Sequence, residues 1–138
     1  MFIWGLQSIL TKEYSFVYME SMLQEGSDIL AQAGFVAINT ITCKPEYVQR
    51  FEELFGSRVG AIDEMEGFLA MRVLKSTEEG PYLVVSFWKS EDNFKNWVGS
   101  EAFHKGHARA FEDLKAYKER GEEPPMHSAF HTYTIIAK

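Results

Sequence analysis

Alternating apolar and polar positions predict four β-strands between residue 35 and the end of the chain. The first covers residues 35–43 (FVAINTITC) and the last covers residues 128–137 (SAFHTYTIIA), and both are rich in β-branched side chains. Between them lie the runs 67–76 (GFLAMRVLKS) and 82–88 (YLVVSFW). A short turn-forming loop separates these two runs, which predicts that they pair as antiparallel neighbours.

Helical spacing of apolar residues predicts a helix over residues 45–64, with Pro45 in its first turn. Its glycines weaken it in isolation, so we expect it to depend on packing against the sheet. The apolar stripe of this predicted helix consists of Val48, Phe51, Phe55, Val59 and Ile62.

The stretch 87–107 (FWKSEDNFKNWVGSEAFHKGH) predicts two more helices in succession. Ser90 suits the N-cap of the first, because acidic residues follow it, and Gly99 suits the position after its end. Ser100 suits the N-cap of the second, whose charged end leads into an exposed loop that finishes at residues 124–125. The inward stripe of the second helix consists of Phe103, His107, Ala110, Phe111 and Leu114.

The resulting order from residue 35 is β-α-β-β-α-β, which predicts a ferredoxin-like α+β fold with helices on one face of an antiparallel sheet. The other face is apolar, and we expect a second copy of the chain to cover it in a homodimer. Residues 35–138 form the predicted main domain. Residues 1–34 form an N-terminal extension with two strand-length apolar runs that could make a hairpin.

Composition narrows the class of protein. The chain has 138 residues, 46% of them hydrophobic and 14% aromatic, so it can build one domain with a substantial core. A net charge of −6 argues against a partner made of nucleic acid. Cys43 is the only cysteine, which excludes an internal disulfide and a thiolate metal cluster. We expect a cytoplasmic protein, because neither a membrane-spanning run nor a signal-peptide pattern is evident.

Three residues invite a chemical interpretation. His107 lies on an apolar helix face, where it is either a hydrogen-bonded core residue or a ligand for haem iron. Asn39 interrupts the first strand, so it is either solvated or directed at a polar group in a pocket. Trp97 is either core or pocket wall. His104 and His107, three residues apart, could form a metal pair, but that face offers no acidic third ligand.

These residues belong to a larger resemblance, which covers roughly residues 35 to 138. The INTIT strand, the MEGF segment, the VVSFWKSEDNFKNW block and the SEAFHKGH helix start are similar to the antibiotic biosynthesis monooxygenase superfamily, and within it to IsdG-type haem-degrading monooxygenases. In that group an Asn on the first strand, a Trp after the WKS strand and a His ten residues later are functional. Asn39, Trp97 and His107 occupy these places in order.

The resemblance implies a dimeric α+β barrel that binds haem as both cofactor and substrate. His107 would be the axial ligand of the haem iron, and Trp97 would press the porphyrin out of plane. Asn39 would hydrogen-bond the distal oxygen ligand or a substrate-bound species. The ring would then be opened with O2 and electrons from an external donor, such as a reductase, and iron would be released.

The resemblance has departures, and two other functions stay open. Thr40 stands where some relatives carry a basic residue, and short relatives lack the 34-residue extension. Lys105 and Arg109 are cations that could serve the haem propionates. The alternatives are a cofactor-free monooxygenase of a quinol-like aromatic, with His107 as an acid/base group, and a non-catalytic dimeric stress or signalling protein.

Overall fold

The computed structural model describes residues 29–58 and 60–138. The chain divides into two compact units, residues 1–32 and residues 33–138. Of the first unit only residues 29–32 are described, and they are helical. The strand-length runs predicted within residues 1–28 therefore lie outside the described residues.

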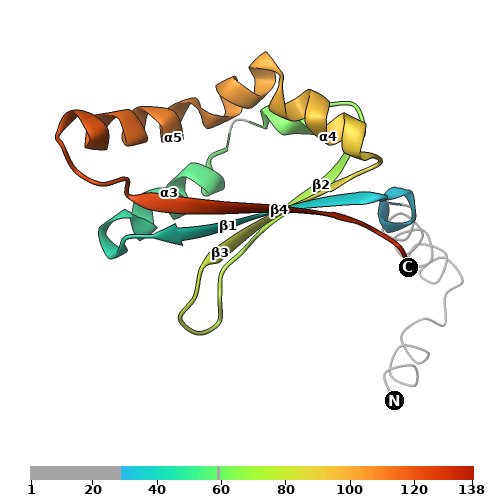
Figure 1. The fold of residues 1–138 in the computed structure, drawn as a ribbon, viewed down its shortest axis with the longest axis horizontal. Coiled ribbons are helices and arrows are strands. Elements are labelled where there is room, and N and C mark those ends of the chain that lie inside the picture. Colours follow the sequence, from blue (N-terminus) through green and yellow to red (C-terminus); the bar gives the residue numbers. More distant parts are fainter. Residues whose placement is uncertain (1–28, 59) are drawn as a thin grey trace, which may run out of the picture. The chain divides into compact units, whose positions relative to one another are not determined.

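The second unit contains an antiparallel sheet (Figure 1). Its strands in the described chain are β1 (Phe35–Cys43), β2 (Phe68–Leu74), β3 (Tyr82–Trp88) and β4 (Met126–Thr134). They lie in the order β2-β3-β1-β4, with all three pairs antiparallel. This confirms the ferredoxin-like fold, because the two outer strands are the second and the last in the domain. Strand β2 is shorter than predicted, and β4 begins and ends earlier than predicted.

The predicted helix over residues 45–64 is wrong as a single element. The structure has a 3-10 turn η1 (Pro45–Tyr47), a helix α3 (Val48–Gly56) and a second 3-10 turn η2 (Ala61–Glu64). Helix α3 ends at Ser57, whose φ of −121° and ψ of 33° lie outside the helical region, and whose hydroxyl donates to the carbonyl of Glu53 at 2.7 Å. Gly60 then adopts the left-handed conformation, with φ of 77°, before η2 begins. Val59, predicted in the stripe, lies outside the described residues.

The other two helices follow their predicted caps. Helix α4 (Glu91–Val98) begins after Ser90, whose hydroxyl accepts a hydrogen bond from the amide of Asn93 at 3.3 Å. Helix α5 (Glu101–Glu119) begins after Ser100, which caps the amide of Phe103 at 3.2 Å. Gly99 ends α4 at φ of −85°, so it does not use the left-handed conformation that glycine permits. Within the described chain, none of the helices is long and apolar enough to cross a bilayer.

Two clusters of buried side chains join the helices to the same face of the sheet, which we call the covered face. One gathers around Trp88 and Trp97 at the start of β1, and the other around Tyr47 and Phe51 at the end of β1. Along β1, Phe35 and Ala37 belong to the first cluster and Ile41 to the second. Asn39 points to the same face of the sheet and lies between the two clusters. The core of this unit is therefore divided along the strand.

The opposite face of the sheet is apolar along the central strands β1 and β3, while the outer strands place His127, His131 and Arg72 on it. The register places Val36 beside Phe87 and Tyr133, and Ile38 beside Val85, on this face. Helices α3, α4 and α5 do not pack on it, because their side chains pack against the two clusters on the other face. We refer to it as the open face.

Candidate active site

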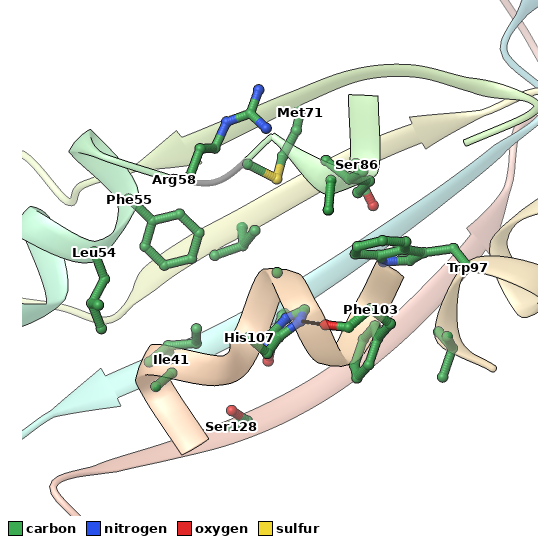
Figure 2. A pocket seen from close by; sticks show the side chains of 18 of the residues that line it. Ile41, Leu54, Phe55, Arg58, Met71, Ser86, Trp97, Phe103, His107 and Ser128 are labelled. Atoms are coloured by element: carbon green, nitrogen blue, oxygen red, sulfur yellow. Dashed lines mark hydrogen bonds between the residues drawn. The ribbon is translucent and has the colours of Figure 1, made fainter. Parts of the chain in front are cut away.

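A cavity of about 350 Å³ lies between the sheet and the helices (Figure 2). Its floor is the covered face of β1, β3 and β4, and its roof is α5, with α3 and α4 at the two ends. Most of the lining is aliphatic or aromatic, with a few polar side chains among them. This volume and lining are typical of small-molecule sites, in which isolated polar groups set the orientation of an apolar ligand.

Helix α5 passes over this cavity instead of packing on the sheet. None of its residues is buried, although it is the longest helix in the described chain. Its inward stripe was predicted correctly and lines the cavity: Phe103 and Ala110 pack against the core clusters while only partly buried, and Phe111 remains 42% exposed. The space beneath α5 is therefore available to a ligand.

His107 projects from α5 into the cavity with its ring orientation fixed by a hydrogen bond. Its Nδ1 lies 2.7 Å from the backbone carbonyl oxygen of Phe103, one turn earlier (Figure 2). Because a carbonyl only accepts, Nδ1 carries the proton and donates, which leaves Nε2 as the basic nitrogen. The imidazole lies between the rings of Phe103, at 4.2 Å, and Phe111, at 5.7 Å between centroids. Metal-binding histidines usually donate their other ring N–H to a carbonyl or carboxylate in this way, so the geometry is compatible with such a role.

The alternative metal pair of His104 and His107 finds no support. His104 is exposed and does not line the cavity. Its ring instead packs edge-on against Phe103, with centroids 5.8 Å apart. Within residues 29–58 and 60–138, no three His, Cys, Asp or Glu side chains lie close enough to hold a metal ion.

Asn39 lines the cavity from the sheet side and carries an unused hydrogen-bonding group. Its Oδ1 atom is buried and accepts no hydrogen bond within the described chain. A buried polar atom without a partner costs about 1–3 kcal/mol of folding free energy. Such atoms are rare in folded proteins, and at the wall of a cavity they indicate a group that serves a ligand.

Trp97 closes the end of the cavity beside His107. It is only 6% exposed, and its ring centroid lies 5.4 Å from that of Phe103 and 6.2 Å from that of His107. Gly106 of α5 also lies beside the indole, where a Cβ atom would make an ordinary van der Waals contact with Cη2 at 3.5 Å. The structure thus brings Asn39, Trp97 and His107 to one cavity, with Trp97 and His107 in neighbouring positions.

Two arginines reach the cavity. Arg58, which the sequence analysis did not single out, forms an exposed ion pair with Asp63, with Nη2 and Oδ1 3.0 Å apart. Arg109 instead binds the end of α3, where it donates to acceptors on Leu54 and Ser57. Lys105 is exposed and does not line the cavity. The only sequence signal for Arg58 was its place just beyond a helix end. Basic residues are common at such positions, so this signal did not distinguish it.

Comparison with known sequences places the chain in a family. The family model described as antibiotic biosynthesis monooxygenase matches residues 34–109. Proteins named heme oxygenase (staphylobilin-producing) from Staphylococcus saprophyticus and Staphylococcus epidermidis are 33% identical over 76 residues, which is 53% of this chain and 72% of each relative. A heme-degrading monooxygenase from Halalkalibacterium halodurans is 38% identical over 56 residues, 38% of this chain and 48% of that relative.

Solved structures share the fold. The heme-degrader MhuD from Mycobacterium tuberculosis, with two hemes bound in its active site, is 22% identical with a TM-score of 0.54, over 75% of this chain and 97% of that chain. SnoaB from Streptomyces nogalater, a cofactor-independent oxygenase, is 19% identical with a TM-score of 0.58, over 77% of this chain and 96% of that chain. Because these two neighbours differ in their cofactor use, the fold by itself does not decide between haem and cofactor-free chemistry.

Proposed function

The chain belongs to the antibiotic biosynthesis monooxygenase family, in its IsdG-type group, and we propose that it binds haem and opens the porphyrin ring by oxidation. The observation that carries this proposal is His107. The contact of Nδ1 with the Phe103 carbonyl leaves Nε2 as the ring nitrogen that can bind a ligand, and the ring projects into an apolar cavity beneath α5. A haem iron takes a neutral imidazole nitrogen of this kind as its axial ligand.

Asn39 and Trp97 have distinct proposed roles. Asn39 lines the cavity, and its side-chain NH2 donates a hydrogen bond to an oxygen of the bound substrate complex, while its Oδ1 can accept one from a donor there. Trp97 is almost fully buried and packs edge-on against Phe103, so it forms a wall of the cavity that would press on a flat ligand. Haem supplies the iron and the ring carbon to be oxidised, while O2 and an external electron donor complete the reaction and iron is released.

Arg58 is the cation that we assign to the substrate carboxylates. Its ion pair with Asp63 is exposed, with 37% and 48% of the two side chains accessible, so the pair contributes little to stability. A propionate can therefore replace Asp63 at small cost. Arg109 is less suited to this role, because its hydrogen bonds are already directed at α3.

The proposal also covers how the enzyme assembles, what supplies its electrons and where it is located. We propose that two copies pair through their open faces in a homodimer, since that face is apolar along β1 and β3, and α3, α4 and α5 leave it uncovered. A reductase would supply electrons, and residues 1–34 would extend the 35–138 domain. A cytoplasmic location fits a chain whose single cysteine, Cys43, is a free thiol.

A cofactor-free oxidation of a quinol-like aromatic is the second candidate. The same basic Nε2 of His107 could take a proton from a phenolic hydroxyl in the aromatic cavity. The cofactor-independent oxygenase SnoaB has the same fold, so the fold is compatible with this chemistry too.

A haemin titration with visible absorbance separates the two candidates. We expect a Soret band that saturates near one haem per chain, disappears in His107→Ala, and bleaches when ascorbate and O2 are added. His104→Ala is the matched control, because it removes an exposed histidine one turn earlier on the same helix. Binding without bleaching would indicate a haem carrier. Absence of binding would refute the haem proposal and favour a quinol substrate.

A further inference from the structure

Helix α5 carries His107, yet it has no buried residues and spans a cavity. Its apolar side chains pack against the two core clusters while only partly buried, so polar contacts at its flanks also contribute to its position. On the side of α3, two charged residues one helical turn apart make these contacts, Arg109 and Asp113. Each binds a different end of α3.

Arg109 holds the carboxyl end of α3. Its Nη1 donates to the Ser57 hydroxyl at 2.9 Å, and its Nη2 donates to the carbonyl oxygens of Leu54 at 3.1 Å and Ser57 at 2.8 Å. Helix ends of this kind present unpaired carbonyls and partial negative charge, which a guanidinium satisfies in both respects. The planar fork of arginine reaches all three acceptors at once, which a lysine ammonium on a flexible stem does not reproduce.

Asp113 holds the amino end of the same helix. Its Oδ2 accepts from the Tyr47 hydroxyl at 2.7 Å and from Nε of Arg50 at 2.9 Å. Burial acts to raise the pKa of Asp113, but these hydrogen bonds outweigh it and hold the pKa below its ordinary value. The cation of α5 thus meets the negative end of α3, and the carboxylate of α5 binds near the positive end.

We propose that Arg109 is a positioning residue for His107, which sets where Nε2 lies over the cavity. The proposal rests on the proposed function of His107 as a ligand. Arg109 lies two residues beyond His107, about 3 Å along the helix axis, whereas Asp113 lies about 9 Å away. The side-chain hydrogen bond of His107 goes to its own helix, so the imidazole moves wherever that part of α5 moves. Arg109 is the nearest polar connection between this part of α5 and the rest of the domain.

The experiment compares Arg109→Met and Arg109→Lys with two controls. Lys105→Met removes a cation at the same sequence distance on the other side of His107, but one that is exposed and makes no hydrogen bond or ion pair within the described chain. Asp113→Asn weakens the other connection to α3. The first measurement needs no haem: it is the nuclear Overhauser contact between the rings of Trp97 and His107, whose centroids are 6.2 Å apart. The second is the haemin affinity.

We expect both Arg109 variants to alter the ring contact and to weaken haemin binding about 10–100-fold, the usual effect of losing a group that orients a metal ligand. Lys105→Met should change neither measurement. Asp113→Asn should lower the melting temperature while leaving the ring contact in place, which separates positioning from general destabilisation.

Two results would overturn the proposal. If Arg109→Lys keeps the affinity of the unaltered protein, the residue contributes only charge. If the ring contact is unchanged in both Arg109 variants, α5 is positioned by other contacts. Failure of haemin binding by the unaltered chain would refute the proposed function instead, and the ring contact would still decide the role of Arg109.

Discussion

Replacing Asn39 by valine should make the protein more stable and less active. The buried Oδ1 atom has no hydrogen-bond partner within the described chain, which costs the folded state about 1–3 kcal/mol. Valine also suits a strand better than asparagine, on a scale that spans about 1 kcal/mol. Because the side chain lies at a cavity wall, the change in shape should cause little overpacking. We expect a net increase in the free energy of unfolding of about 1–3 kcal/mol.

The assay is urea unfolding followed by circular dichroism, with the midpoints compared at equal slope. Ser128→Val is the matched control, because Ser128 lines the same cavity on the neighbouring strand but is exposed. The change in the unfolding free energy of Ser128→Val reports the strand preference of valine, because this substitution removes no buried unpaired atom. The bleaching of bound haem should be lost in Asn39→Val and kept in Ser128→Val. A fall in the unfolding free energy of Asn39→Val would refute the reasoning, since it would show that the amide is paired and structural.

Two other predictions concern the framework around the cavity. Gly67→Ala should cost about 3 kcal/mol of unfolding free energy, because φ there is 78° and a Cβ atom would overlap the side chain of Asn93. Gly121→Ala, with φ of 71° and open space, should cost only about 1 kcal/mol. Equal costs of the two substitutions in urea unfolding would disprove the clash. Asp113→Asn should cost about 1–2 kcal/mol at pH 7. The pKa of Asp113 is lowered in the folded state, so its carboxylate stabilises the fold above the ordinary pKa of 3.8, and this stabilisation is lost as the pH falls through the folded-state pKa. The difference in unfolding free energy between the unaltered protein and Asp113→Asn should therefore narrow below pH 3.8. A difference of constant size would contradict this.

The strands and the helix caps were predictable because they depend on local pattern. The β-branched alternation of residues 35–43 and the run 82–88 gave the observed bounds of β1 and β3, and Ser90 and Ser100 cap their helices as predicted. The break after α3 was not predictable in this way. It is stabilised by Arg109, which is more than 50 residues away along the chain and binds the carbonyls that a continuous helix would have used.

The candidate site also has features that the sequence could predict and features that it could not. Asn39, Trp97 and His107 could be found because the family pattern keeps their spacing, and the structure brings them to one cavity. Their proposed roles stay predictions. The sequence could not show that the stripe of α5 covers a cavity, since an apolar helix face looks the same whether it packs on a sheet or roofs a pocket. It also could not distinguish Arg58, whose ion pair is exposed, from Arg109, which is bound to α3.

The cavity exists because small and polar residues meet in register on the covered face. Ala37 pairs with Ser86, and Asn39 pairs with Val84, so the floor between the two core clusters carries no large side chain on β1 or β3. Aromatic residues on either side supply the packing that closes both ends. A continuous core along β1 would have brought α5 down onto the sheet and buried its stripe. The division of the core therefore keeps α5 raised, and with it the His107 nitrogen that we assign to haem.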